Sequence, residues 1–171
     1  MDYQDILAAL AQAAVRFVVV GGYAVVLHGV PRFTRDLDLL VDLDRDNLEK
    51  LLSALERLGL ESRPPVPADQ LLSERHRRRW IEEKGLRAFS FWHPEHPYLV
   101  VDVLLVCPVS FEDAFEESVE VSWQEQTARI AGIEHLIAMK RRAGRKQDVS
   151  DVEALEKVLE LREEERRDHG G

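Results

Sequence analysis

The sequence predicts an α+β fold in which helices pack on a small mixed β-sheet. Short apolar runs of strand length are interspersed with longer segments whose apolar residues recur at helical spacing. Their order does not follow a strict strand–helix–strand alternation, which favours a mixed sheet over a purely parallel one. The length of 171 residues favours one domain over residues 1–171. Within it we expect a core over about residues 15–131 and C-terminal helices over about residues 133–165.

The chain starts with a predicted helix and a predicted strand. Apolar residues recur at helical spacing over residues 3–14, and Ala14 closes this apolar face. The next apolar run, Phe17–Val20, has the length of a short strand, and the Gly21-Gly22 pair ends it.

A short helix, a loop and a second strand follow. Residues 23–27 have the pattern of the first turns of a helix. Gly29 and Pro31 mark residues 28–34 as a loop. The second strand is predicted at Asp36–Val41, where apolar residues surround two aspartates.

The next predicted helix carries leucines at helical spacing from Leu48 to Leu58. Asp44 or Asp46 is placed to cap it, and Gly59 is placed to stop it. The remaining predicted elements are a loop (61–70), a charged helix (71–84), strands (88–92 and 98–106), a short helix (110–117), short strands (119–122 and 127–131) and two helices (133–143 and 149–165). The charged tail after the last helix is expected to fray.

Composition and charge restrict the classes of function. The net charge of −9 argues against a protein that coats nucleic acid, although it does not exclude a local basic groove. The single cysteine, Cys107, excludes a disulfide within the chain and a cysteine zinc cluster. The N-terminal residues lack the pattern of a signal peptide, and no apolar run approaches the roughly 20 residues that span a membrane. We expect a cytoplasmic protein.

Three aspartates within apolar strands are the main candidates for chemistry. Asp36 and Asp38 are two residues apart in one strand, so their side chains share a face, and Asp102 lies inside a second apolar run. Unpaired charges are costly to bury, and a divalent cation would compensate them. Oxygen ligands of this kind suit Mg²⁺. Such a trio can hold two cations that act on a displacement at phosphorus, and the Gly21-Gly22 turn would let the backbone approach a phosphate.

These residues form a recognisable pattern. The segments GG, PRFTRDLDLLVD and VVDVLL resemble the nucleotidyltransferase superfamily of the DNA polymerase β type. In that superfamily a glycine turn precedes an Asp-x-Asp pair, and here Gly22 precedes Asp36 by 14 positions. The Arg-x-Thr-x-Asp-x-Asp form and the segment IEHLIAMKRRAGRKQDVSDVEAL resemble most closely the small AbiEii-type and other toxin–antitoxin nucleotidyltransferases. The resemblance covers roughly residues 15–157. One departure is Gly22, where serine is common.

The resemblance implies the palm-like nucleotidyltransferase fold and assigns roles to residues. It implies that Asp36, Asp38 and Asp102 are catalytic and bind two Mg²⁺ ions. The nucleotide phosphates would contact residues of the glycine turn, the following loop and a late helix: Gly21, Gly22, Arg32, Thr34, Lys140 and Arg145. Asp148 and Asp151 match the same late pattern, without an assigned role.

The implied activity is transfer of a nucleoside monophosphate from a nucleoside triphosphate to a hydroxyl group. The acceptor stays open between tRNA, a protein and a small molecule. The protein would be an enzyme, and one alternative makes it the toxin of a pair with a cognate antitoxin. A further alternative is a non-catalytic nucleotide-binding or regulatory module that keeps the fold.

Other charged groups have plainer interpretations. The basic cluster at residues 75–79 could contact RNA, but a solvated helix face paired with neighbouring glutamates is favoured. His93 and His96 have a spacing that zinc ligands can show, yet the surrounding prolines indicate a turn. His28 is expected at the surface or in a helix cap.

Overall fold

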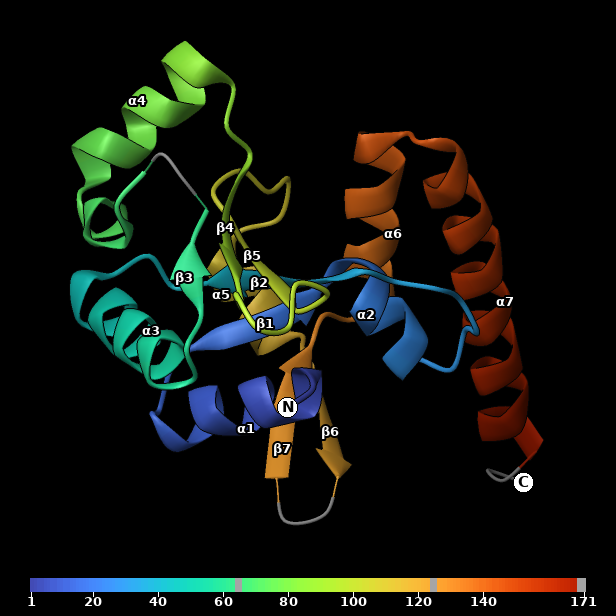
Figure 1. The fold of residues 1–171 in the computed structure, drawn as a ribbon. Coiled ribbons are helices and arrows are strands. Elements are labelled where there is room, and N and C mark those ends of the chain that lie inside the picture. Colours follow the sequence, from blue (N-terminus) through green and yellow to red (C-terminus); the bar gives the residue numbers. More distant parts are fainter. Residues whose placement is uncertain (64–65, 124–125, 169–171) are drawn as a thin grey trace.

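The central element of the computed structural model, which describes residues 1–63, 66–123 and 126–168, is a seven-stranded mixed sheet (Figure 1). Its strands are β1 (Phe17–Val20), β2 (Asp36–Val41), β3 (Glu61–Ser62), β4 (Ala88–Trp92), β5 (Val100–Leu104), β6 (Val119–Trp123) and β7 (Gln126–Ile130). They lie in the order β3-β4-β5-β2-β1-β7-β6. β2 pairs in parallel with β5 and antiparallel with β1, so the predicted mixed sheet is confirmed.

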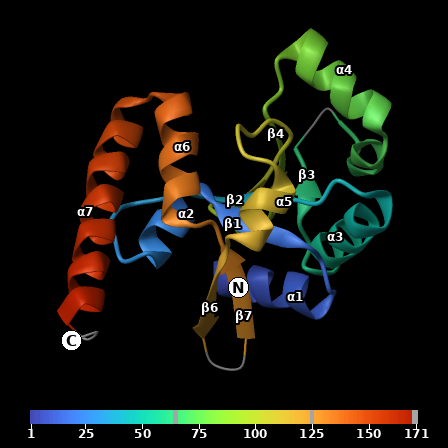
Figure 2. The ribbon, with the colours of Figure 1, turned by 180° about the vertical axis from the view of Figure 1, so that it is seen from behind.

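Helices pack around both ends of this sheet. They are α1 (Tyr3–Gln12), α2 (Gly21–Leu27), α3 (Arg45–Arg57), α4 (Glu74–Lys84), α5 (Phe111–Glu116), α6 (Ile133–Ala143) and α7 (Lys146–Asp168), with a 3₁₀ helix at Ala68–Leu72. Figures 1 and 2 show α6 and α7 side by side next to α2, whereas α3 and α4 lie at the opposite end of the sheet. None of the helices in the described part of the chain is long and apolar enough to cross a membrane.

The strand register separates an apolar face from a polar one. Leu37 and Leu39 of β2 pair with Val101 and Val103 of β5, and all four are fully buried. Because side chains alternate along a strand, the residues between them project from the other face. The core on one side of the sheet therefore leaves the aspartates of β2 and β5 on the opposite side.

Several elements have the predicted bounds. The strands at 17–20, 36–41 and 88–92 and the helix at 133–143 are confirmed residue by residue. Asp44 is the cap of α3, since its side chain accepts a hydrogen bond from the backbone N–H of Asp46.

Other boundaries were wrong. α1 ends at Gln12, and Ala14 is exposed with a φ of 51°, so Ala14 does not close the apolar face. α2 begins at Gly21 itself, and β5 covers only Val100–Leu104.

The predicted loop at 61–70 contains β3 and the start of the 3₁₀ helix, although its residues 64–65 lie outside the described residues. β3 is a two-residue edge strand, too short to show a pattern of its own. The helix predicted over 71–84 begins only at Glu74, after its cap Ser73.

The last helix, α7, begins at Lys146 and extends to Asp168. It starts earlier than predicted because Asp148 bonds the backbone N–H of Arg145 and so closes the first turn. Of the tail expected to fray, residues 169–171 lie outside the described residues.

Candidate active site

The polar face of the sheet brings the three predicted aspartates together. Asp38 of β2 lies directly opposite Asp102 of β5, and Asp36 lies opposite Val100. Ser90 of β4 is paired with Asp102 on the other side. The three carboxylates are half-buried and share one face of neighbouring strands, as the sequence predicted.

The negative charges on this face are not fully compensated by nearby cations. Burial, then the charges of Asp102 and Asp36, raise the pKa of Asp38 to about 7. Burial and then the Asp102 charge raise the pKa of Asp36 from its ordinary value. The Oδ1 atom of Asp102 is buried and has no hydrogen-bond partner in the described part of the chain. Such an orphaned oxygen calls for a ligand from outside the chain.

The donor set is suited to Mg²⁺, although the structure does not show a formed metal site. Among residues 1–63, 66–123 and 126–168, no group of three or more His, Cys, Asp or Glu side chains is arranged to hold a metal ion. The chemistry nevertheless fits, because Asp36, Asp38 and Asp102 offer hard carboxylate oxygens and one of these oxygens has no partner. A bound cation would also relieve the repulsion that raises the pKa of Asp38.

The glycine turn lies directly against these carboxylates. Gly21 has a φ of +65°, and a Cβ atom there would lie 1.9 Å from Oδ2 of Asp38. A Cβ atom at Gly22 would lie 2.6 Å from Oγ1 of Thr34 and 3.1 Å from Cζ of Arg32. Gly21 therefore requires glycine, and a side chain at Gly22 would displace the side chains of Thr34 and Arg32.

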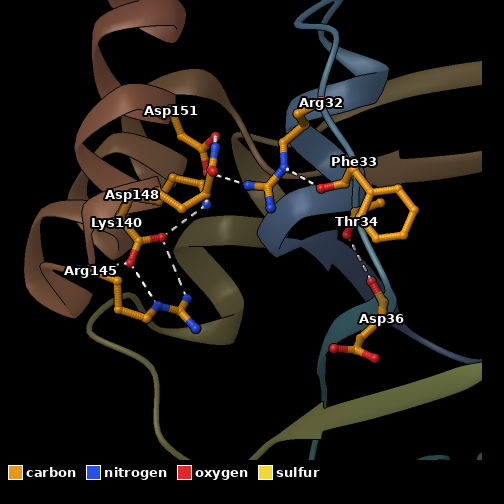
Figure 3. A network of polar contacts seen from close by, with 9 residues as sticks. Arg32, Phe33, Thr34, Asp36, Lys140, Arg145, Asp148 and Asp151 are labelled. Atoms are coloured by element: carbon orange, nitrogen blue, oxygen red, sulfur yellow. Dashed lines mark hydrogen bonds and ion pairs between the residues drawn. The ribbon is translucent and has the colours of Figure 1, made fainter.

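A buried network of ion pairs lies next to the glycine turn (Figure 3). Nζ of Lys140 is 2.6 Å from Oδ2 of Asp151 and 3.3 Å from Oδ1 of Asp148. The guanidinium group of Arg32 pairs with the same Asp151 carboxylate, and Arg145 donates to Asp148 over 2.8 Å. Lys140 is 5% exposed and both aspartates are 2% exposed, so these three charges are removed from solvent, whereas the Arg145 side chain is 77% exposed.

The cations of this network stabilise the charged form of Asp148. Burial raises the pKa of Asp148, but hydrogen bonds from the Arg145 side chain and backbone and the charge of Lys140 outweigh it. The pKa of Asp148 is therefore below its ordinary value. The positive charges of Lys140 and Arg145 also act on Asp38, whose pKa they lower against the dominant effects of burial and its acidic neighbours.

A cavity of about 150 Å³ joins the two groups of aspartates. Gly21, Asp38, Lys140 and Arg145 line its polar part. These four predicted residues are thus brought together around one space. Arg32 and Thr34 do not line this cavity; their side chains lie against Gly22, and Arg32 pairs with Asp151. Sequence reasoning missed the apolar lining, because nothing in a short apolar run indicates which side chains face a cavity.

The plainer interpretations hold for most of the other charged groups. In α4, Arg78 pairs with Glu74 and Arg79 with Glu83, as the pattern of alternating charge predicted. Nδ1 of His93 accepts hydrogen bonds from backbone N–H groups of the turn that follows it. His28 differs from the expectation of a surface position: it occupies the C-cap of α2, but it is buried and bonds the carbonyl oxygen of Ala131 over 2.8 Å.

Comparisons with known proteins agree with this geometry. A family model described as the nucleotidyl transferase AbiEii toxin of a type IV toxin–antitoxin system matches residues 5–163. No protein with a curated description matches the chain.

Two solved structures share the fold. The lincosamide antibiotic adenylyltransferase LnuA, solved with lincomycin bound, is 18% identical with a TM-score of 0.59, over 91% of this chain and 95% of that one. ANT(2")-Ia, solved in complex with adenylyl-2"-tobramycin, is 16% identical with a TM-score of 0.57, over 98% of this chain and 96% of that one.

Proposed function

The chain belongs to the AbiEii nucleotidyl transferase family, and from that membership we propose that it moves a nucleoside monophosphate from a nucleoside triphosphate to a hydroxyl group in a magnesium-dependent reaction. The observation that carries the proposal is the register of β2 and β5, which sets Asp38 opposite Asp102 with Asp36 on the same face. These three carboxylates, which form no ion pair within the described part of the chain, lie beside a cationic network and favour a metal-bound polyphosphate as the ligand.

The phosphates of the donor are proposed to bind beside Asp38, at the polar part of the cavity. Lys140 and Arg145 line it together with Gly21, so positive charge and accessible backbone adjoin the catalytic carboxylates. Two of the three N–H donors of Lys140 are used by Asp148 and Asp151, which fixes the ammonium group while a third donor remains for phosphate. Arg32 and Thr34 pack against the same turn at Gly22.

The proposed reaction is an in-line displacement at the α-phosphorus. Asp36, Asp38 and Asp102 would hold two Mg²⁺ ions, which when bound neutralise charge on the reacting phosphate and acidify the acceptor hydroxyl. Asp102 takes the hydroxyl proton as the acceptor oxygen bonds to the α-phosphorus. The bond from that phosphorus to the oxygen bridging to the β-phosphate breaks, and pyrophosphate leaves. The protein contributes mainly position and charge.

Two classes of acceptor are proposed, and each can be tested. One of the two proteins that share the fold is named as a lincosamide antibiotic adenylyltransferase, and the other was solved in complex with adenylyl-2"-tobramycin, which supports a small-molecule hydroxyl as the acceptor. The family description names a toxin of a toxin–antitoxin system, which supports a cognate antitoxin. For such a toxin we propose a cellular acceptor such as tRNA or a protein.

The experiment incubates the purified protein with each of the four α-labelled triphosphates and Mg²⁺. Parallel reactions contain total tRNA, an aminoglycoside, a lincosamide, or no added acceptor. Label on one acceptor identifies the substrate class and the nucleotide, and label on the protein itself identifies protein nucleotidylation.

The matched variant is Asp36→Ala, which removes a proposed metal ligand on the half-buried polar face without removing core packing. It should keep the melting temperature and lose transfer. Full transfer by this variant would sink the assignment of the carboxylate face as the active site.

A further inference from the structure

The cavity beside Asp38 has an apolar half that the proposed chemistry leaves unused. This half is lined from the end of β5 and from α6 by Leu104, Val106, Cys107, Leu136 and Met139. Leu104 is two residues beyond Asp102 in the same strand, so both side chains project from the same face of the sheet. The apolar half therefore begins directly beside the carboxylate face.

The size of the cavity restricts what it can enclose. Pockets that enclose a whole drug-sized ligand usually measure about 300–1,000 Å³. This cavity has a volume of about 150 Å³. It can hold one ring system, but it cannot hold a complete nucleotide or an aminoglycoside.

The two halves also differ in charge. One half offers Asp38, Lys140 and Arg145 to a charged group. In the other half the polar side chains are Cys107 and the exposed Arg87; burial raises the pKa of the Cys107 thiol, so it is neutral at pH 7. Met139 supplies a polarizable thioether, which packs well against flat rings.

We propose that the apolar half is the subsite for the nucleobase of the donor triphosphate, held between Leu104 of β5 and Met139 of α6. This inference rests on the proposed function, because it takes the ligand of the polar half to be a triphosphate. It also defines the orientation of the donor nucleotide in the site. With the base against α6 and the phosphates at Asp38, the Asp36 end of the carboxylate face is left for the acceptor.

The test separates the base from the phosphates. Calorimetry in Mg²⁺ measures the binding of each of the four nucleoside triphosphates and of inorganic tripolyphosphate, which has no base. In Met139→Trp the indole should fill the apolar half of the cavity. It should weaken every nucleoside triphosphate by at least about tenfold and leave tripolyphosphate within about twofold of the wild type.

The matched control is Ala138→Trp. Ala138 is the preceding residue of α6, is exposed and does not line the cavity. It receives the same side chain on the same helix and should bind all five ligands as the wild type does. Nucleoside triphosphate binding that survives intact in Met139→Trp would overturn the inference.

A second variant guards against a misfolded Met139→Trp protein. Met139→Ala enlarges the apolar half of the cavity and removes contacts with the base. It should therefore weaken the binding of nucleoside triphosphates about threefold to tenfold and leave the binding of tripolyphosphate unchanged. Equal loss for both kinds of ligand would contradict a base subsite. A wild-type protein that binds neither ligand would instead refute the proposed function, and the base subsite with it.

Discussion

Two groups of aspartates lie within one small region of this protein and have opposite electrostatic surroundings. Asp36, Asp38 and Asp102 lie on the sheet, where burial and the Asp102 charge raise the pKa of Asp36 and of Asp38, and where one Asp102 oxygen has no hydrogen-bond partner among the described residues. Asp148 and Asp151 sit on α7, where Lys140 and two arginines neutralise them at contact distance. The second pair is more deeply buried than the first group.

The difference shows that burial alone does not identify a reactive carboxylate. A buried carboxylate with fitted cations is part of the structure, because losing either partner leaves an unpaired charge. A carboxylate held near others of its own sign costs folding energy, and it persists where a ligand compensates it. The following changes test this division.

The largest effect is expected for Asp38→Asn in the unpaired group. The amide keeps the size of the side chain but removes a charged oxygen ligand, so transfer should fall by at least about 10⁴-fold. Folding stability should stay unchanged or rise, since the variant removes repulsion with Asp36 and Asp102. Initial rates and urea unfolding measure the two quantities. A large loss of stability would contradict the comparison.

The same substitution in the paired group should act on stability. Asp151→Asn leaves Arg32 without its carboxylate and weakens the hold on Lys140, so the free energy of unfolding should fall by about 3 kcal/mol. Urea unfolding is the measurement. Glu160→Gln, at an exposed position of the same helix, is the control and should change stability by less than about 0.5 kcal/mol.

A smaller effect is expected from pH on the metal-free protein. Unfolding returns the pKa of Asp38 from about 7 to 3.8, so between these values the folded state binds the extra proton. Stability should therefore be greatest at the acidic end and should fall as pH rises through about 7, by about 1–3 kcal/mol between pH 5 and 8. Unfolding in EDTA over this range measures the loss, and Asp38→Asn should lose distinctly less.

The smallest effect is expected from Mg²⁺ on the thermal stability of the wild type. A ligand at ten times its dissociation constant stabilises the folded state by about 1.4 kcal/mol. The melting temperature at pH 8 should therefore rise with Mg²⁺ and return when EDTA is added. The rise should vanish in Asp38→Asn and survive in Glu160→Gln, and an equal rise in both variants would place the ion elsewhere.

The parts of this fold that could be predicted from sequence are those with local causes. Alternating side chains define β2, and Gly144, in the left-handed conformation with a φ of 66°, ends α6 where the pattern predicted. The aspartates stood out for the same reason, since a charged residue in an apolar strand is a local anomaly.

What the sequence could not reveal depends on distant contacts. Arg32 pairs with Asp151, which lies 119 residues later in the chain. Local sequence patterns could not predict this ion pair, and only a direct phosphate contact was expected for Arg32. β3 forms only because Glu61 and Ser62 meet the edge of β4. The cavity wall combines Leu104 with Met139, which belong to separate elements and become neighbours only in the folded chain.

The ion pair between Arg32 and Asp151 has a consequence for the order of events on the ribosome. The carboxylate face is complete once β5 has left the exit tunnel, because β1, β2 and β5 then lie within the emerged chain. The loop that carries Arg32 must wait for α7. We therefore expect a nascent chain that has the three aspartates but not yet α7 to lack the contact that holds Arg32 beside the glycine turn.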